Sequence, residues 1–142
     1  VILTEGEKMI KTPTYHVFHM YRHHQDADLL ESSVTGVKEI GTDEWKVPAI
    51  TESVSVDADG VITITVNNLS MEDGETLDIQ FADSGYKVAE ANIVAHEDMH
   101  AKNTFDAPEE VCEREFTDYT MTERVLCAKL PNNCVVEIRV KK

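Results

Sequence analysis

The sequence has little of what contact with a polyanion or a membrane requires. Its 142 residues include 13 Lys plus Arg against 27 Asp plus Glu, a formal net charge of -14. Nucleic-acid binding needs clustered Lys and Arg to contact phosphates, so this balance argues against it. No apolar run approaches the roughly 20 residues that a membrane-spanning helix needs. We therefore expect neither a nucleic acid nor a membrane as a partner.

Cysteine is also scarce and odd in number. Cys112, Cys127 and Cys134 are too few for a disulfide framework. Cys127 and Cys134 fall in two neighbouring strand patterns and could pair if apposed, but the favoured interpretation is reduced thiols in the core. Glu110 and Glu113 lie beside Cys112, whereas a catalytic thiol needs a nearby base and an electropositive setting. We interpret all three cysteines as structural.

Signatures of common catalytic chemistry are missing as well. The sequence contains no HExxH, no CxxC, no glycine-rich phosphate loop and no nucleophile elbow. Asp57, Asp59 and Gly60 resemble the start of a calcium loop, but the EF-hand spacing and its terminal Glu are absent. This segment is better explained as a β-turn.

The histidines are the remaining candidates for a metal site. They form two groups at helical spacing: His16, His19 and His23 at i, i+3 and i+7, and His96 and His100 four residues apart. Zinc would need three or four ligands held by supporting groups. We interpret His16 and His19 as residues that pack or hydrogen-bond within a helix between domains. His23 and His24 would lie near the C-terminal end of that helix and complement its dipole.

A helix is predicted over residues 12–25, TPTYHVFHMYRHHQ. Thr12 is suited to the N-cap and Pro13 to the first helical position. Apolar and aromatic side chains cover more than one face of this helix: Tyr15, Val17, Phe18, Met20 and Tyr21. One thin partner could not bury them all. We expect this surface to pack against an upstream domain, and the abrupt start VILT suggests that the natural N-terminus lies elsewhere.

Residues beyond 28 read as short strands separated by turns. Asp59–Gly60, Asp73–Gly74 and Ser84–Gly85 are turn signals. The predicted segments are 29–46 (strand and loop), 50–56, 61–66, 77–81, 86–95, 124–130 and 134–140. The last two are predicted to pair across a turn at 131–133. Strands at such spacing indicate an antiparallel sandwich or barrel.

Two phrases in the sequence resemble a known family. Residues 12–30 fit the pattern TPTYHVF-x-MY-x-x-HQ-x-A-x-LL, and residues 103–111 read NTFDAPEEV. Both are similar to phrases of the family 51 glycoside hydrolases, the α-L-arabinofuranosidases. The first marks the passage from the catalytic barrel into the C-terminal domain, and the second a loop of that domain. Lys102 stands where family members often have His.

The resemblance implies a two-domain parent, with a (β/α)8 barrel beside a β-sandwich of jelly-roll type. Such enzymes are retaining: one glutamate attacks the anomeric carbon and the other acts as acid and base. The family's acid/base Glu follows an Asn, but this sequence has no Asn–Glu dipeptide, and a barrel takes about 250 residues. We therefore expect both catalytic glutamates upstream of Val1, and no catalytic, cofactor-binding or metal-binding residue and no cofactor in this chain.

The expected division is a terminal strand–helix piece of the barrel at 1–25 and a C-terminal accessory domain at 26–142. The fold class is mainly β, an antiparallel sandwich of jelly-roll type with one N-terminal α-helix left over from the barrel.

The parent is expected to hydrolyse terminal α-L-arabinofuranosyl residues from arabinan, arabinoxylan or their oligosaccharides, as a cytoplasmic homo-oligomer in L-arabinose metabolism. This piece would be inactive alone and structural, with its own barrel as partner. The alternative is a carbohydrate-binding module for arabinose-containing polysaccharide. Binding sandwiches usually present rows of exposed aromatic residues, and with 6% aromatics and no evident row, the structural role is favoured.

Overall fold

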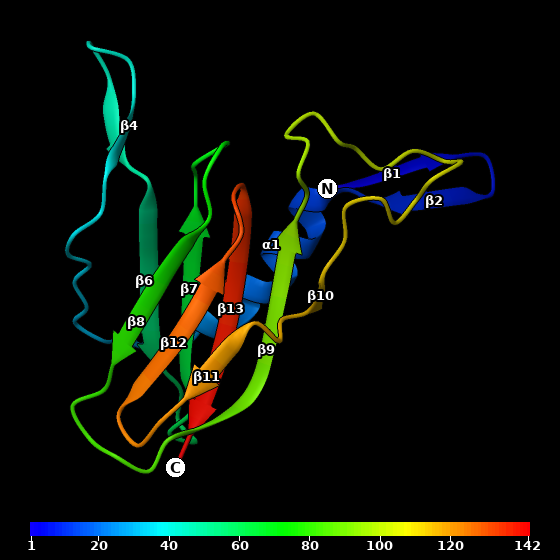
Figure 1. Cartoon of the computed structure of the whole chain (residues 1–142). Helices are drawn as coiled ribbons and strands as arrows, with labels where there is room; N and C mark the ends of the chain where they lie inside the picture. Colours follow the sequence, from blue (N-terminus) through cyan, green and yellow to red (C-terminus); the bar gives the residue numbers. More distant parts are fainter.

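Two antiparallel sheets face each other in the computed structural model, which describes residues 1–142 (Figure 1). The larger sheet has the order β10 (Arg114–Glu115), β9 (Lys87–Ala95), β13 (Cys134–Lys141), β7 (Ile62–Asn68), β6 (Ile50–Val56) and β3 (Asp28–Leu29). The smaller sheet has the order β11 (Tyr119–Met121), β12 (Val125–Leu130) and β8 (Glu75–Gln80). The predicted mainly β sandwich is confirmed.

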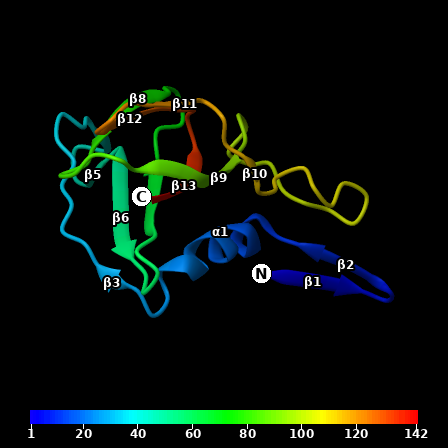
Figure 2. The ribbon, with the colours of Figure 1, turned by 90° about the horizontal axis from the view of Figure 1, so that it is seen from below.

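The remaining elements lie outside the two sheets. They are the hairpin of β1 (Ile2–Glu5) and β2 (Lys8–Lys11), the helix α1 (Pro13–Tyr21), the 3-10 turn η1 (Arg22–His24), and the hairpin of β4 (Glu39–Gly41) and β5 (Lys46–Pro48). Figure 2 shows α1 against the outer face of the larger sheet, opposite the smaller one. No helix has the length and apolar character needed to cross a bilayer.

Period-two alternation explains the core. Ile64 on β7, Ile138 on β13 and Leu126 on β12 are all buried between the sheets in one apolar cluster. Successive side chains of a strand point to opposite faces, so Thr63 and Thr65 of β7 lie on the outer face of the larger sheet. These threonines are nevertheless buried, because the N-terminal helix covers that face.

The predicted strands at 50–56 and 61–66 and the turn at Asp59–Gly60 are confirmed, and the two strands form a hairpin. β6 pairs with β7 in antiparallel register, Val56 opposite Ile62. In the connecting turn, the Asp57 carboxylate accepts hydrogen bonds from the backbone N–H groups of Asp59 and Val61, and Gly60 has a φ of +77°. The segment that resembled a calcium loop is therefore a turn in which the Asp57 side chain accepts from backbone N–H groups two and four residues further on.

The predicted pairing of 124–130 with 134–140 is wrong. β12 pairs with β8 and β11, whereas β13 pairs with β7 and β9. The turn at 131–133 carries the chain from one sheet to the other, and Asn68 Nδ2 donates to Pro131 O at 2.9 Å. Crossing between sheets lets both apolar faces enter one core from opposite sides, which a hairpin within one sheet could not do.

The predicted helix is confirmed, in a shorter form. α1 ends at Tyr21 and η1 continues the turn to His24. Thr12 has the extended backbone of an N-cap, but its hydroxyl donates to Val1 O and accepts no hydrogen bond from the helix. Met20 is fully buried, while Phe18 on the same helix is 65% exposed.

Removing a core side chain at the sheet–sheet contact should cost much of the stability. Leu126→Ala replaces a side chain with 0% exposure, and we expect the free energy of unfolding to fall by about 2–5 kcal/mol. Leu29→Ala, at a leucine that is 84% exposed, is the matched control and should change it by less than about 0.5 kcal/mol. Urea titration followed by circular dichroism measures both. Equal losses would contradict the assignment of the core.

Candidate functional site: the helix–sheet interface

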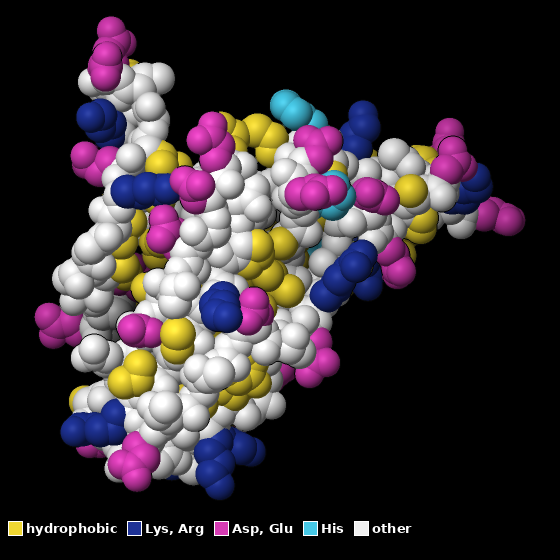
Figure 3. Space-filling view, in the orientation of Figure 1, with side chains coloured by type: hydrophobic (Ala, Val, Ile, Leu, Met, Phe, Trp, Pro, Cys, Tyr) yellow, Lys and Arg dark blue, Asp and Glu magenta, His cyan; other side chains and the backbone are white.

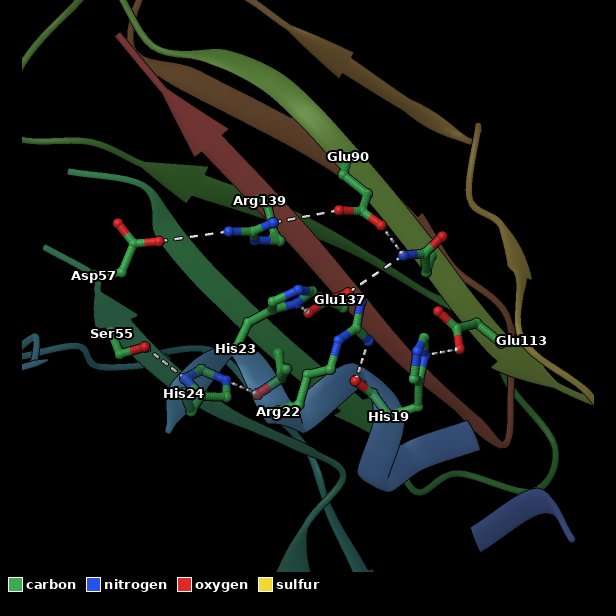
Figure 4. A network of polar contacts seen from close by, with 12 residues as sticks. His19, Arg22, His23, His24, Ser55, Asp57, Glu90, Glu113, Glu137 and Arg139 are labelled. Carbon is green, nitrogen blue, oxygen red and sulfur yellow. Dashed lines mark hydrogen bonds and ion pairs between the residues drawn. The ribbon is translucent and has the colours of Figure 1, made fainter. Parts of the chain in front are cut away.

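The outer face of the larger sheet holds a network of polar side chains under the N-terminal helix (Figure 4). α1 and η1 contribute His19, His23 and His24 to it. We call the contact between these histidines and the sheet the helix–sheet interface. Its sheet-side members are Ser55, Asp57, Thr65, Glu90, Asn92, Glu113, Glu137 and Arg139.

Glu137 is the central group of this interface. It lies mid-strand on β13 with 0% exposure, and His23 Nδ1 donates to Glu137 Oε1 at 2.5 Å. Asn92 Nδ2 donates to the other carboxylate oxygen at 3.3 Å. Burying a carboxylate is costly unless it is paired and hydrogen-bonded. The helix therefore supplies a partner that this strand residue requires.

A second set of charges extends the network along the sheet. Arg139 reaches Glu90 at 3.4 Å and Asp57 at 3.5 Å. Asn92 Nδ2 also donates to Glu90 Oε1 at 3.0 Å. These contacts hold the pKa of the Glu90 carboxyl below its usual value, the hydrogen bond from Asn92 being the largest cause. Glu90 thus stays ionised beside Arg139.

His24 is held between two hydroxyl groups of the sheet. Its Nδ1 lies 2.7 Å from Ser55 Oγ and its Nε2 3.0 Å from Thr65 Oγ1. Thr65 Oγ1 donates to Ser53 O, so it accepts from His24 Nε2–H, and Ser55 then donates to Nδ1. Burial lowers the pKa of His24.

The N-terminal part of α1 lines a small polar hollow of about 300 Å³. His19 Nδ1 donates to Glu113 Oε2 at 2.7 Å, and Tyr15 stacks on His19 with ring centroids 6.2 Å apart. The lining residues are Lys11, Tyr15, His16, His19, Asn92, Glu113, Arg114 and Glu115. Burial lowers the pKa of His16.

The histidine predictions were thus incomplete. His23 and His24 do lie near the end of the helical segment, but their partners are side chains of the sheet and not the helix dipole alone. His96 is elsewhere, 3.3 Å from Glu110. No group of three or more His, Cys, Asp and Glu is arranged to hold a metal ion. The signal that could have found the interface is the pair of charges, Glu137 and Arg139, in the otherwise apolar segment CVVEIRV.

The three cysteines are free thiols on three separate segments. Cys127 and Cys134 lie on strands of different sheets. Cys134 is buried, which raises the pKa of its thiol to about 11. Cys127 is only half-buried, so the expected core position is wrong for it; a hydrogen bond with Asp78 raises its pKa. Cys112 borders a wider hollow of about 580 Å³ together with His96 and Arg114.

Removing the buried carboxylate should destabilise the molecule strongly. Glu137→Ala leaves His23 and Asn92 without their acceptor, and we expect a loss of about 3–5 kcal/mol in the free energy of unfolding. Glu90→Ala, at a side chain that is 42% exposed, should cost less than about 1 kcal/mol. Chemical denaturation measures both variants. A neutral result for Glu137→Ala would show that the helix does not depend on this pair.

Stability should fall as the pH drops below the ordinary histidine pKa of 6.5. The folded protein lowers the pKa of His16 and His24, so the unfolded chain binds more protons there and stability rises with pH. The contribution of these two histidines to stability is complete above pH 6.5. It is lost as the pH falls toward their lower pKa values in the folded protein. Unfolding at pH 7.5 and 5.5 measures the slope, and His24→Gln should reduce it. A slope that His24→Gln leaves unchanged would contradict the assignment of this pH dependence to His24.

This chain is similar to known proteins over nearly its whole length. The model of the alpha-L-arabinofuranosidase C-terminal domain matches residues 1–133. An intracellular exo-alpha-L-arabinofuranosidase of Bacteroides ovatus is 30% identical over 141 residues, which cover 99% of this chain and 27% of that protein.

Solved structures agree. A GH51 arabinofuranosidase from Xanthomonas axonopodis pv. citri matches with a TM-score of 0.91 at 28% identity, over 99% of this chain and 28% of that one. A family 51 alpha-L-arabinofuranosidase from Bifidobacterium longum shares the fold, with a TM-score of 0.88 at 21% identity over 99% of this chain and 28% of that one. This chain spans less than a third of each relative. It belongs to the family of alpha-L-arabinofuranosidase C-terminal domains.

Proposed function

We propose that this chain is the non-catalytic C-terminal domain of a retaining α-L-arabinofuranosidase. The parent would hydrolyse terminal α-L-arabinofuranosyl residues from arabinan, arabinoxylan or their oligosaccharides. The observation that carries this proposal is the family match over residues 1–133. This chain covers only 27% and 28% of two relatives. The rest of such a protein has room for a separate catalytic domain that holds both glutamates.

The division of the chain at residue 25 is part of this proposal. Residues 1–25 would complete the upstream barrel, and 26–142 would form the accessory sandwich. Exposed apolar side chains support it, because five of the eleven large ones lie on these 25 residues: Val1, Ile2, Leu3, Met9 and Phe18. Figure 3 shows the β1–β2 hairpin projecting from the body, with apolar side chains among its charges. A barrel packed here would cover them.

The role of the domain follows from the helix–sheet interface. α1 would belong to the barrel by its place in the chain. Together with η1 it is bound to the sandwich by His19, His23 and His24. The sandwich would thereby brace the last helix of the barrel. The name of the Bacteroides ovatus relative supports a cytoplasmic location, and the homo-oligomeric parent stays part of the proposal.

Carbohydrate binding by the sandwich is the competing function. Only two aromatic side chains are exposed, Phe18 at 65% and Trp45 at 80%. They lie on different elements, α1 and the β4–β5 hairpin, and so form no stacking platform. The structural role therefore has the better support.

The purified chain should hydrolyse no aryl α-L-arabinofuranoside, because the proposed catalytic glutamates lie upstream. It should also migrate unretarded in a gel that contains arabinan. The parent with its upstream residues, assayed in parallel, should release the aryl alcohol. Turnover by the chain alone, surviving repurification, would refute the proposal. Retardation by arabinan that Trp45→Ala abolishes would establish a binding module instead.

A further inference from the structure

A buried asparagine of the NTFDAPEEV loop holds the base of the β1–β2 hairpin. Asn103 is 7% exposed, and its Nδ2 donates to Lys11 O and to Val111 O, both at 2.8 Å. Its Oδ1 accepts from Val111 N at 2.7 Å. Lys11 is the last residue of β2. One side chain of the sandwich therefore holds the backbone at the base of the hairpin.

Beyond this base, no hydrogen bond joins residues 1–9 of the hairpin to the sandwich. Thr12 N donates to Val1 O at 2.9 Å and closes its open end. Ile10 is 4% exposed, whereas every residue from 1 to 9 is exposed. The hairpin projects away from both sheets (Figures 1 and 2). Its direction is thus set at Ile10 and Lys11, where Asn103 acts.

The topology indicates where this hairpin would lie in the parent. In a (β/α)8 barrel, each strand is followed by a loop at the catalytic face and then by a helix. Barrel strands are all parallel, but β2 runs antiparallel to β1, so β2 is not a barrel strand. If α1 is the last barrel helix, the turn between β1 and β2 lies in the last strand-to-helix connection. Such loops form the substrate-binding face.

We propose that Asn103 is a positioning residue, which orients the β1–β2 hairpin so that its charged tip contacts the substrate. The tip residues are Glu5, Glu7 and Lys8 around Gly6, which has a φ of +60°. A hairpin that projects from the barrel mouth would reach the sugars beyond the terminal arabinofuranosyl unit. Its carboxylates and ammonium group would form hydrogen bonds with the hydroxyl groups of those sugars. This inference rests on the proposed function. It assigns to the sandwich a part in selecting oligosaccharides.

The test compares two buried asparagines in the parent enzyme. Asn68 is bonded like Asn103: its Nδ2 donates to Asp73 O and Pro131 O, and its Oδ1 accepts from Ser70 N. Asn68→Ala is therefore a matched control at a turn between the sheets. Asn103→Ala should raise KM for a short α-L-arabino-oligosaccharide about tenfold, with kcat and the kinetics on an aryl arabinofuranoside changed less than about twofold. Asn68→Ala should shift neither KM.

Two further measurements keep the inference testable should Asn103→Ala fold poorly. The combined change Glu5→Ala and Glu7→Ala, at exposed positions, should raise the same KM, and adding Asn103→Ala should increase it little further. In this chain alone, Asn103→Ala should speed amide exchange at residues 8–12, and Asn68→Ala should not.

Three results would separate the possible failures. Equal effects of Asn103→Ala and Asn68→Ala on both substrates would overturn the inference, because Asn103 would then act only on stability. Unchanged oligosaccharide kinetics in the tip variant would overturn it as well. An unsubstituted parent that hydrolyses neither substrate would refute the proposed function itself.

Discussion

The contact between Glu137 and His23 is the interaction on which the outer face of the sheet depends. A carboxylate in the middle of a central strand can be buried only if its oxygens are paired. β13 provides no such partner. His23, which lies 114 residues away in the sequence, supplies it from the helical segment. Because His23 must reach Glu137, η1 has to lie across β13 and β7. The burial of Thr63 and Thr65 then follows from the position of the helix.

The interface is specific because its members differ in charge. His23 faces a carboxylate, whereas His24, one residue later, faces two hydroxyl groups. A helix shifted by one residue would place each imidazole against the wrong partner. Polar contacts of this kind add little net energy and much geometric selectivity. The apolar contact of Met20 with Val94 and Val111 supplies burial beside them.

Sequence reasoning reached the elements of the fold but not their partners. The helix and the β6–β7 hairpin could be predicted because capping, turn residues and period-two alternation are local signals. The sheet that receives a strand after a turn is decided by the core, which is why β12 and β13 were wrongly paired. The partners of His19, His23 and His24 lie 31 to 114 residues away. No local pattern connects them, although Glu137 between Val136 and Ile138 was a visible anomaly.

The double attachment of α1 has a mechanical consequence. Domains joined by a flexible linker can rotate against each other about the linker residues. In the proposed parent, α1 and η1 would be covalently continuous with the barrel and bonded through three imidazoles to the sandwich, so no free hinge would separate the two domains. Rotation would require His23 to leave a carboxylate with 0% exposure. The two domains would then move as one rigid body, and a cut between residues 25 and 26 would divide the sequence without dividing the folded molecule.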